Sequence, residues 1–400
     1  MMNIRFDYVA HPLLLLLAAN AVVFPNANQV LLASLLGFAS LLSIITKHSF
    51  RLKNFKYWLA PAFVTIAYCV VGIINGASYD AIIQALIIYG ISPVLWILVI
   101  DFTWRLFGFE RAIKYFAIIS LLACVSVPIF IYLFDSYGAT AVDIFGSQIK
   151  NVNIRDGEIG ATMHVAGSLI FISAAFVAEP KVLKNKYLLV SLIFAIVFSV
   201  LSVGRTMAIL ALAIGVFFNV ANSKITWKRL FYYSITIVGL ITFLNYSFHE
   251  YYGIDILETF DPHLRKISDT SESRPEQVSA LISGAFDNML LGSGHGIGVD
   301  YIRSEDMPWR YEAVYFALLF KLGVLGLIII LYPFIASSFI FLKAALGHNI
   351  KKYDIFFGAA MFSSLAAGFT NPYPEAFSFQ WMYVIPAYYF LSGVRRSAVN

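Results

Sequence analysis

Lysine and arginine gather at every second connection between the long apolar runs of this chain. If the runs are threaded through a bilayer in order, one side receives 19 of the 28 Lys and Arg residues but five of the 23 Asp and Glu residues. Membrane proteins concentrate basic residues in short cytoplasmic loops. The alternation therefore predicts a multi-pass membrane protein with both termini in the cytoplasm. The basic residues on this side are Arg5, Lys47, Arg51, Lys53, Lys56, Arg105, Arg111, Lys114, Lys181, Lys184, Lys186, Lys224, Lys228, Arg229, Lys343, Lys351, Lys352, Arg395 and Arg396.

The apolar runs have the length of membrane-spanning helices. About 17 to 25 residues cross roughly 30 Å of hydrocarbon as a helix, and 60% of the chain is hydrophobic against 13% charged. Open sheet edges cannot be satisfied in lipid, so each span should be helical. The sequence predicts an all-α membrane protein with about twelve transmembrane helices. The runs lie near 9–24, 28–46, 57–75, 81–100, 113–134, 159–178, 186–202, 205–222, 228–247, 311–342, 354–371 and 376–394.

Two segments on the predicted outer side break this rhythm, a short one near 135–158 and a long one at 248–310. The long segment divides the chain into helices one to nine (1–247), an outer loop or cap (248–310) and helices ten to twelve (311–400). Within the cap, 274–291 is predicted as an amphipathic helix, with Ser273 as its cap and Pro275 in its first turn. Its expected apolar face consists of Val278, Leu281, Ile282, Ala285 and Phe286.

A glycine-rich run, Leu291-Gly-Ser-Gly-His-Gly-Ile-Gly298, follows this helix. Glycine-rich phosphate-binding loops follow a strand, and this run does not. We therefore interpret it as a flexible connection.

Arg205 lies in Leu201-Ser-Val-Gly-Arg-Thr206, between two apolar runs too close together to leave a real loop. The arginine is thus held at the outer membrane boundary, on the side that basic residues normally avoid. Two interpretations stay open. The side chain snorkels to the lipid headgroups, or it binds an anion, since charges at the membrane edge that face a helix bundle are usually functional.

An ordered set of motifs gives the chain a family resemblance. Ser202-Val-Gly-Arg-Thr206 precedes an Ala/Leu-rich helix, and the long outer loop contains Ser273-Arg-Pro-Glu-Gln-Val-Ser-Ala-Leu-Ile282. The glycine-rich run comes next, and then Tyr311-Glu-Ala-Val-Tyr-Phe-Ala-Leu-Leu-Phe-Lys-Leu-Gly-Val-Leu-Gly326. In order and spacing, over about half of the chain, this pattern resembles the O-antigen ligase/polymerase superfamily.

The resemblance implies a bacterial inner-membrane glycosyltransferase with a GT-C-like fold of about twelve helices. It implies a large periplasmic loop between helices nine and ten, with the active site facing the periplasm. Its chemistry would act, without metal or cofactor, on undecaprenyl-diphosphate-linked glycans as donor and acceptor. Ligases of this type usually carry histidine in the stretch that leads into helix ten, which here reads 309–315 as Trp-Arg-Tyr-Glu-Ala-Val-Tyr. The departure favours a Wzy-type polymerase of lipid-linked repeat units, which would invert the anomeric configuration, over an O-antigen ligase that transfers polymer to lipid A-core.

The reaction needs a cation for the diphosphate, a base for the attacking hydroxyl and platforms for sugars. Arginine stays charged and grips phosphate oxygens in a fork. The base would take the proton of the hydroxyl, and a carboxylate at the edge of the bilayer suits this role. For the diphosphate, Arg205 and Arg274 match the family's motif arginines, and Arg155 and Arg310 are second-rank candidates. For the base, the first candidate is Glu312, followed by His295, Asp287 and Glu375. The sugar platforms include Trp309, Tyr311 and Tyr315, and Tyr373, Phe377 and Trp381 also lie near the outer face.

Two further charged or polar residues fall inside or beside apolar runs. Lys321 follows Tyr311 by about three helical turns, a depth at which lysine should face protein, water or phosphate. It belongs to the diphosphate site or pairs with an acid that the sequence does not identify. His164 begins helix six and is interpreted as structural. Cys69 and Cys124 lie in apolar runs as packing residues.

The rival function of another class is a secondary transporter or a flippase of lipid-linked glycans. Such transporters usually show two related halves, and no repeat of the first six helices is visible in the last six. A nucleic-acid partner is not expected, because the basic residues are spread over short loops. The expected partners are the lipid-linked glycan and membrane lipids, with a chain-length regulator as an open question.

Overall fold

The computed structural model describes residues 7–46, 55–138, 140–141, 152–153, 162–203, 205–222, 273–305, 307–347 and 349–392, and within these the chain is almost entirely helical. One antiparallel pair of two-residue strands, β1 with β2, accompanies the helices. The elements in chain order are α1 (Asp7–Val23), α2 (Gln29–Ile45), α3 (Lys56–Ile74), α4 (Tyr79–Ala85), the π-helix η2 (Leu86–Ile91), α5 (Ser92–Phe107), α6 (Phe109–Tyr137), β1 (Val152–Asn153), β2 (Thr162–Met163), α8 (Val165–Ala178), η3 (Pro180–Val182), α9 (Lys186–Val203), α10 (Thr206–Asn222), α13 (Ser273–Asp287), α14 (Val314–Leu346), α15 (Lys352–Ala367), η4 (Tyr373–Glu375), η5 (Phe377–Phe379) and α16 (Gln380–Leu391).

Five of these helical stretches are long and apolar enough to cross a membrane, and the prediction of a helical, multi-pass membrane protein is confirmed. The predicted run 228–247 lies outside the described residues, and each of the other eleven runs overlaps a helix. Shorter apolar helices surround the long ones. The five long stretches are Lys56–Ile74, Tyr79–Phe107, Phe109–Phe134, Lys186–Val203 and Val314–Leu346.

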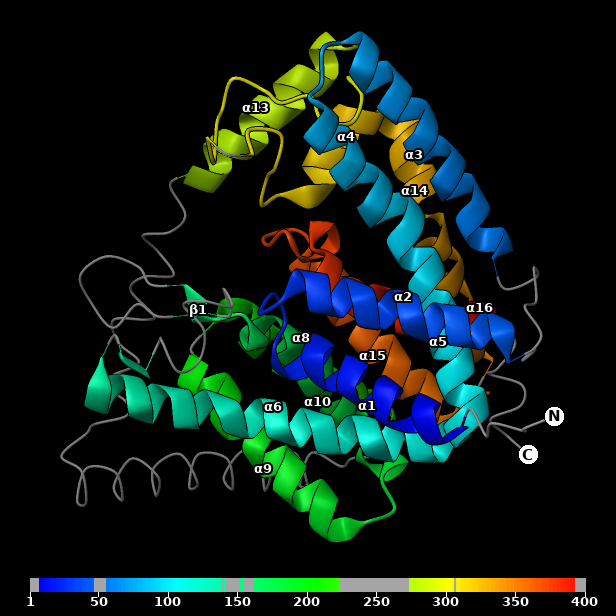
Figure 1. Cartoon of the computed structure of the whole chain (residues 1–400), viewed down its shortest axis with the longest axis vertical. Coiled ribbons are helices and arrows are strands. Elements are labelled where there is room, and N and C mark those ends of the chain that lie inside the picture. Colours follow the sequence, from blue (N-terminus) through cyan, green and yellow to red (C-terminus); the bar gives the residue numbers. More distant parts are fainter. Residues whose placement is uncertain are drawn as a thin grey trace.

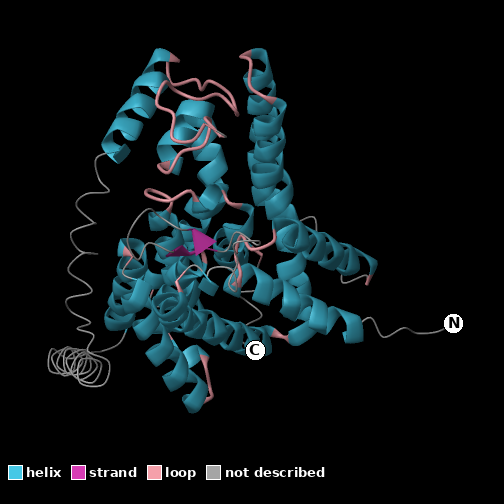
Figure 2. Cartoon of the chain, turned by 60° about the vertical axis from the view of Figure 1, so that its left-hand side comes forward, coloured by secondary structure: helices cyan, strands magenta, loops and turns pink. Residues whose placement is uncertain are grey.

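The helices form two bodies that are joined by the long stretches (Figures 1 and 2). The larger body packs α1, α2, α6, α8, α9, α10, α15 and α16 around one hydrophobic core. The smaller body consists of α3, α4, α13 and the first part of α14, with three small cores of its own. Helix α5 continues α4 through η2 and carries the chain from the smaller body into the larger one (Figure 1).

Helix ends that the charge pattern assigns to one side of the membrane do meet in space. Lys184, before α9, forms a 2.7 Å ion pair with Glu110 at the start of α6. The hydroxyl of Tyr388, near the end of α16, donates to Asp101 near the end of α5 at 2.6 Å. In the described part of the chain, two pairs of the helix ends assigned to this side therefore contact each other.

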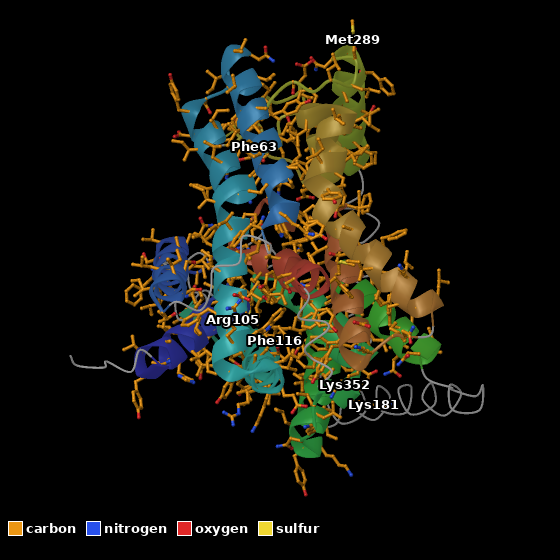
Figure 3. The ribbon with its side chains drawn as sticks, turned by 90° about the vertical axis from the view of Figure 1, so that its right-hand side faces the viewer. Phe63, Arg105, Phe116, Lys181, Met289 and Lys352 are labelled. Carbon is orange, nitrogen blue, oxygen red and sulfur yellow. The ribbon has the colours of Figure 1, made fainter. Side chains whose placement is uncertain are left out.

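The two ends are far apart in the molecule. Lys181 and Lys352, both from predicted cytoplasmic connections, lie near each other in Figure 3, and Met289, from the predicted outer cap, lies at the opposite extreme.

Helix α14 is broken inside the membrane-spanning stretch. Gly323 has φ 65° and ψ −176°, which no helix residue adopts. The break leaves backbone groups without helical partners, and lipid offers them none. The glycine-rich turn supplies the partners: Ser293 and Gly294 donate their N–H groups to the carbonyls of Phe320 and Lys321 at 2.9 and 2.8 Å, and Val324 donates to the carbonyl of Leu290 at 3.0 Å.

The interpretation of residues 291–298 as a flexible connection is therefore wrong. Gly292 and Gly294 have φ of +94° and +95°, and their backbones lie directly against the α14 break and α3. A Cβ atom at Gly294 would lie 2.3 Å from the backbone nitrogen of Gly72. Glycine is required here for close approach and for left-handed φ, so the turn is a fixed plug in the helix break.

The predicted amphipathic helix exists as α13, with two corrections. It begins at Ser273, the residue predicted as its cap, one residue before the predicted start at 274. It ends at Asp287 instead of residue 291, because Met289 and Leu290 adopt positive φ of 53° and 59°. Its buried stripe is also rotated, since Gln277 is 2% exposed whereas Phe286 is 64% exposed.

Substitution of Gly294 by alanine should destabilise the protein strongly. An L-residue with left-handed φ costs roughly 1–2 kcal/mol, and overpacking against α3 adds about 1–3 kcal/mol. Gly37→Ala is the matched control, because a Cβ there meets nothing within 4 Å and the residue lies inside α2. Thermal unfolding in detergent should show a clearly lower Tm for the first variant and an unchanged or higher Tm for the second. Equal Tm values for both variants would contradict the plug.

Candidate functional site

The predicted outer helix ends converge on the loop between α15 and α16, residues 368–379, which we term the central loop. Pro372 and Pro374 stop the helix here, because proline cannot donate to the helical ladder. The loop crosses between the two bodies as a red-orange segment in Figure 1. It contains η4 and η5, and it carries Tyr373 and Glu375.

A buried ion pair ties the central loop to the smaller body. Lys321 Nζ lies 3.1 Å from Glu375 Oε1, and the two side chains are 4% and 6% exposed. The hydroxyl of Tyr89, in the π-helix η2, donates to the same oxygen at 2.9 Å. Glu375 is thus the acid that the position of Lys321 required, and the sequence named both residues without joining them.

Arg310 lies beside this pair without a carboxylate partner among the described residues. Its Nη2 donates to the backbone carbonyl of Glu375 at 3.5 Å, and its Nη1 approaches the sulfur of Met307 at 3.8 Å. Its Nε is buried and has no hydrogen-bond partner in the described structure. A guanidinium with spare donors can bind an anion in a fork.

The charges of Arg205 and Glu312 both reach Tyr373. Burial raises the pKa of Tyr373, the positive charge of Arg205 lowers it, and the negative charge of Glu312 raises it, so both groups act on one phenol. No carboxylate among the described residues forms an ion pair with Arg205. Within the described residues, a cation without an ion-pair partner and an acid therefore both act on the central loop.

His164 directly precedes α8, and the charge of Arg205 reaches it. Burial, and then the charge of Arg205, lower its pKa. Its Nδ1 lies 3.4 Å from the amide nitrogen of Asn26, whose Oδ1 accepts a hydrogen bond from Ser378 in the central loop. These contacts join the outer ends of α1, α8 and α16.

Glu312 precedes α14, in the place predicted for the base. Its Oε1 forms a 2.8 Å ion pair with Arg303. Its backbone N–H and that of Ala313 both donate to the side-chain oxygen of Gln277 at 3.0 Å. The buried Gln277 of α13 thus caps the start of α14. The side chain of Glu312 is 23% exposed, so it is in part accessible from the surface.

His295, the second candidate base, is enclosed. It is 1% exposed and stacks on Tyr89 with ring centroids 5.3 Å apart. Burial, followed by the charge of Lys321, lowers its pKa to about 3, so the ring is neutral at physiological pH. Its Nε2 has no partner in the described structure. In this structure the ring is therefore closed to a substrate, which contradicts a role as the base.

The predicted sugar platforms are used for packing in this structure. Tyr311 is fully buried, and its hydroxyl accepts the N–H of Val299 at 2.7 Å. Tyr315 donates to the carbonyl of Leu365 at 2.7 Å and so joins α14 to α15. Trp309 is half-buried and donates its indole N–H to Gln84 at 2.9 Å. Of the three, Trp309 is the best placed to meet a sugar.

The remaining predicted site residues are described only in part. Arg274 lies in the first turn of α13, whose Ser273 end points toward β1 in Figure 1, and its side chain lies outside the described residues. Arg155 lies outside the described residues altogether. Asp287, at the other end of α13, is exposed. Trp381 is 1% exposed and belongs to the main core.

Sequence reasoning missed Asn26, Gln84, Tyr89 and Gln277. Each lies in an apolar or loop segment, and each acquires its role from a partner far away in the chain. The sequence signal for these residues was weak, because an isolated polar side chain in such a segment does not identify its partner.

A scan against protein-family models matches no family, and a search of curated proteins finds no relative.

Proposed function

We propose that the chain is a membrane glycosyltransferase that polymerises undecaprenyl-diphosphate-linked oligosaccharide repeat units. In this proposal the protein lies in the inner membrane of a bacterium with about twelve transmembrane helices. Both termini are cytoplasmic, and the cap of 248–310 and the central loop face the periplasm. The single observation that carries the proposal is the placement of Arg205 and Arg310, two guanidiniums without carboxylate partners among the described residues. The charge of Arg205 acts on Tyr373 and Arg310 donates to the carbonyl of Glu375, and both of these residues lie in the central loop.

The proposed reaction is a glycosyl transfer. A hydroxyl oxygen of the acceptor repeat unit attacks the anomeric carbon of the donor, the bond from that carbon to the diphosphate oxygen breaks, and undecaprenyl diphosphate leaves with the electron pair. The arginines stabilise the negative charge that develops on the diphosphate. Arg274, in the first turn of α13, is a third donor in this proposal.

Glu312 accepts the proton of the attacking hydroxyl. Its side chain is 23% exposed, forms an ion pair with Arg303, and acts electrostatically on Tyr373, as Arg205 does. Attack from the side opposite the diphosphate inverts the configuration at the anomeric carbon. The glutamate occupies the stretch in which ligases of the resembled superfamily carry histidine, and for this reason the polymerase is preferred to the ligase.

Replacement of Arg205 should abolish most of the transfer while the protein still folds. Purified protein in proteoliposomes would be supplied with synthetic undecaprenyl-diphosphate repeat units, and the product ladder would be followed by electrophoresis. Loss of one donor to the developing charge costs about 10²- to 10³-fold. Arg205→Ala should lose this much, and Arg205→Lys should recover little, because a point charge lacks the fork.

Arg111→Ala is the matched control, since Arg111 is an exposed arginine in the first turns of α6 at the other end of the molecule. It should polymerise at the wild-type rate. If Arg205→Ala also keeps wild-type rate and product length, Arg205 serves as an interfacial anchor and the proposed site is incorrect.

Replacement of Glu312 by glutamine tests its role as the base. The amide keeps the size of the side chain but accepts no proton, so transfer should slow by about 10²- to 10⁴-fold. Donor binding should be unchanged. A wild-type rate for Glu312→Gln across the pH range would mean that Glu312 orients the acceptor or that no base is needed.

A further inference from the structure

Two irregular stretches of membrane-spanning helix meet at the Lys321–Glu375 contact. Tyr89 lies in η2, a six-residue π-helix between α4 and α5. Lys321 lies two residues before the break at Gly323 in α14. Both departures from regular α-helix occur where their side chains reach the same carboxylate oxygen. Inserted π-turns of this kind are frequent at functional sites.

The glycine-rich turn holds the backbone of Lys321 independently of the contact between its side chain and Glu375. Its carbonyl accepts the N–H of Gly294 at 2.8 Å, and the carbonyl of Phe320 accepts the N–H of Ser293 at 2.9 Å. The plug therefore determines where the lysine points.

Glu375 connects the fixed Lys321 to the central loop. Its carboxylate is held by Lys321 and Tyr89, and its own backbone carbonyl accepts from Arg310. Tyr373, two residues earlier in the same short helix η4, is reached by the charges of both Arg205 and Glu312. The charged ends of the pair are nearly inaccessible, at 4% and 6% exposure, so the pair itself cannot meet a bulky glycan diphosphate.

We propose that Lys321 and Glu375 form a positioning pair. The pair holds the central loop so that Arg310 and Tyr373 face the diphosphate of the bound lipid, and it does not itself touch the substrate. This inference rests on the proposed function, because it assigns two further residues to the same site.

Removal of both charges of the Lys321–Glu375 pair distinguishes a role in positioning the central loop from a role in the stability of the protein. Lys321→Met and Glu375→Gln alone each leave one buried polar partner unmatched, and the single variants should lose stability. The double variant removes both charges, and its Tm should return close to that of the wild type. Its central loop is no longer held, so transfer should stay slower by about 10²-fold, the scale expected for displacement of about 1 Å in an active site.

Binding of undecaprenyl diphosphate, free of any glycan, is measured on the same purified proteins by tryptophan fluorescence in detergent. The double variant should bind this lipid about tenfold or more weakly than the wild type, since misplaced supporting residues loosen a site. The matched control is the double variant Lys184→Met with Glu110→Gln, which neutralises an exposed 2.7 Å pair at the opposite end. It should bind and transfer as the wild type does.

The outcomes are distinct. A double variant with recovered Tm and wild-type Kd and transfer rate would overturn the positioning role and leave the pair as a structural contact. If the wild-type protein binds the lipid diphosphate and only the double variant fails, the inference stands. If the folded wild-type protein itself neither binds nor transfers the lipid, the proposed function fails and the inference falls with it.

Discussion

The buried contact between the ammonium of Lys321 and the carboxylate of Glu375 is the interaction on which the centre of this protein depends. Removal of one partner from such a pair typically costs about 3–5 kcal/mol, because the other charge stays buried and unmatched. The contact joins α14 to the central loop, and Tyr89 adds the η2 segment. Three elements far apart in the sequence are therefore fixed relative to one another at one carboxylate oxygen.

The Lys321–Glu375 contact lies beside the break in α14, and the break itself requires hydrogen-bond partners for its backbone groups. Freed backbone groups at Gly323 must find partners inside the protein, since lipid supplies none. The glycine-rich turn provides them, and its glycines have the φ values and the close approach that other residues could not adopt. A run that resembles a flexible linker in sequence is thus a structural plug, and the ion pair, the plug and the central loop form one connected unit.

The apolar helices and the gathering of their ends could be predicted, because length, hydropathy and loop charge are local properties of the sequence. The position of Arg205 between α9 and α10 could be predicted for the same reason, since the two apolar runs leave no room for a loop. The Lys321–Glu375 pair could not be predicted, because the partners are 54 residues apart and tertiary packing selects them. The buried side of α13 could not be predicted either. Gln277 is buried because it accepts hydrogen bonds at the start of α14, and hydrophobicity gives no sign of such a contact.

A structure of the protein in lipid nanodiscs with undecaprenyl diphosphate bound, determined by electron cryomicroscopy, tests the central claim most directly. The account predicts diphosphate density beside the central loop, within hydrogen-bonding distance of the guanidiniums of Arg205 and Arg310. It also predicts that α14 stays broken at Gly323 and that Lys321 still contacts Glu375. Density for the diphosphate at another place, or a continuous α14 with the lysine and glutamate apart, would contradict it.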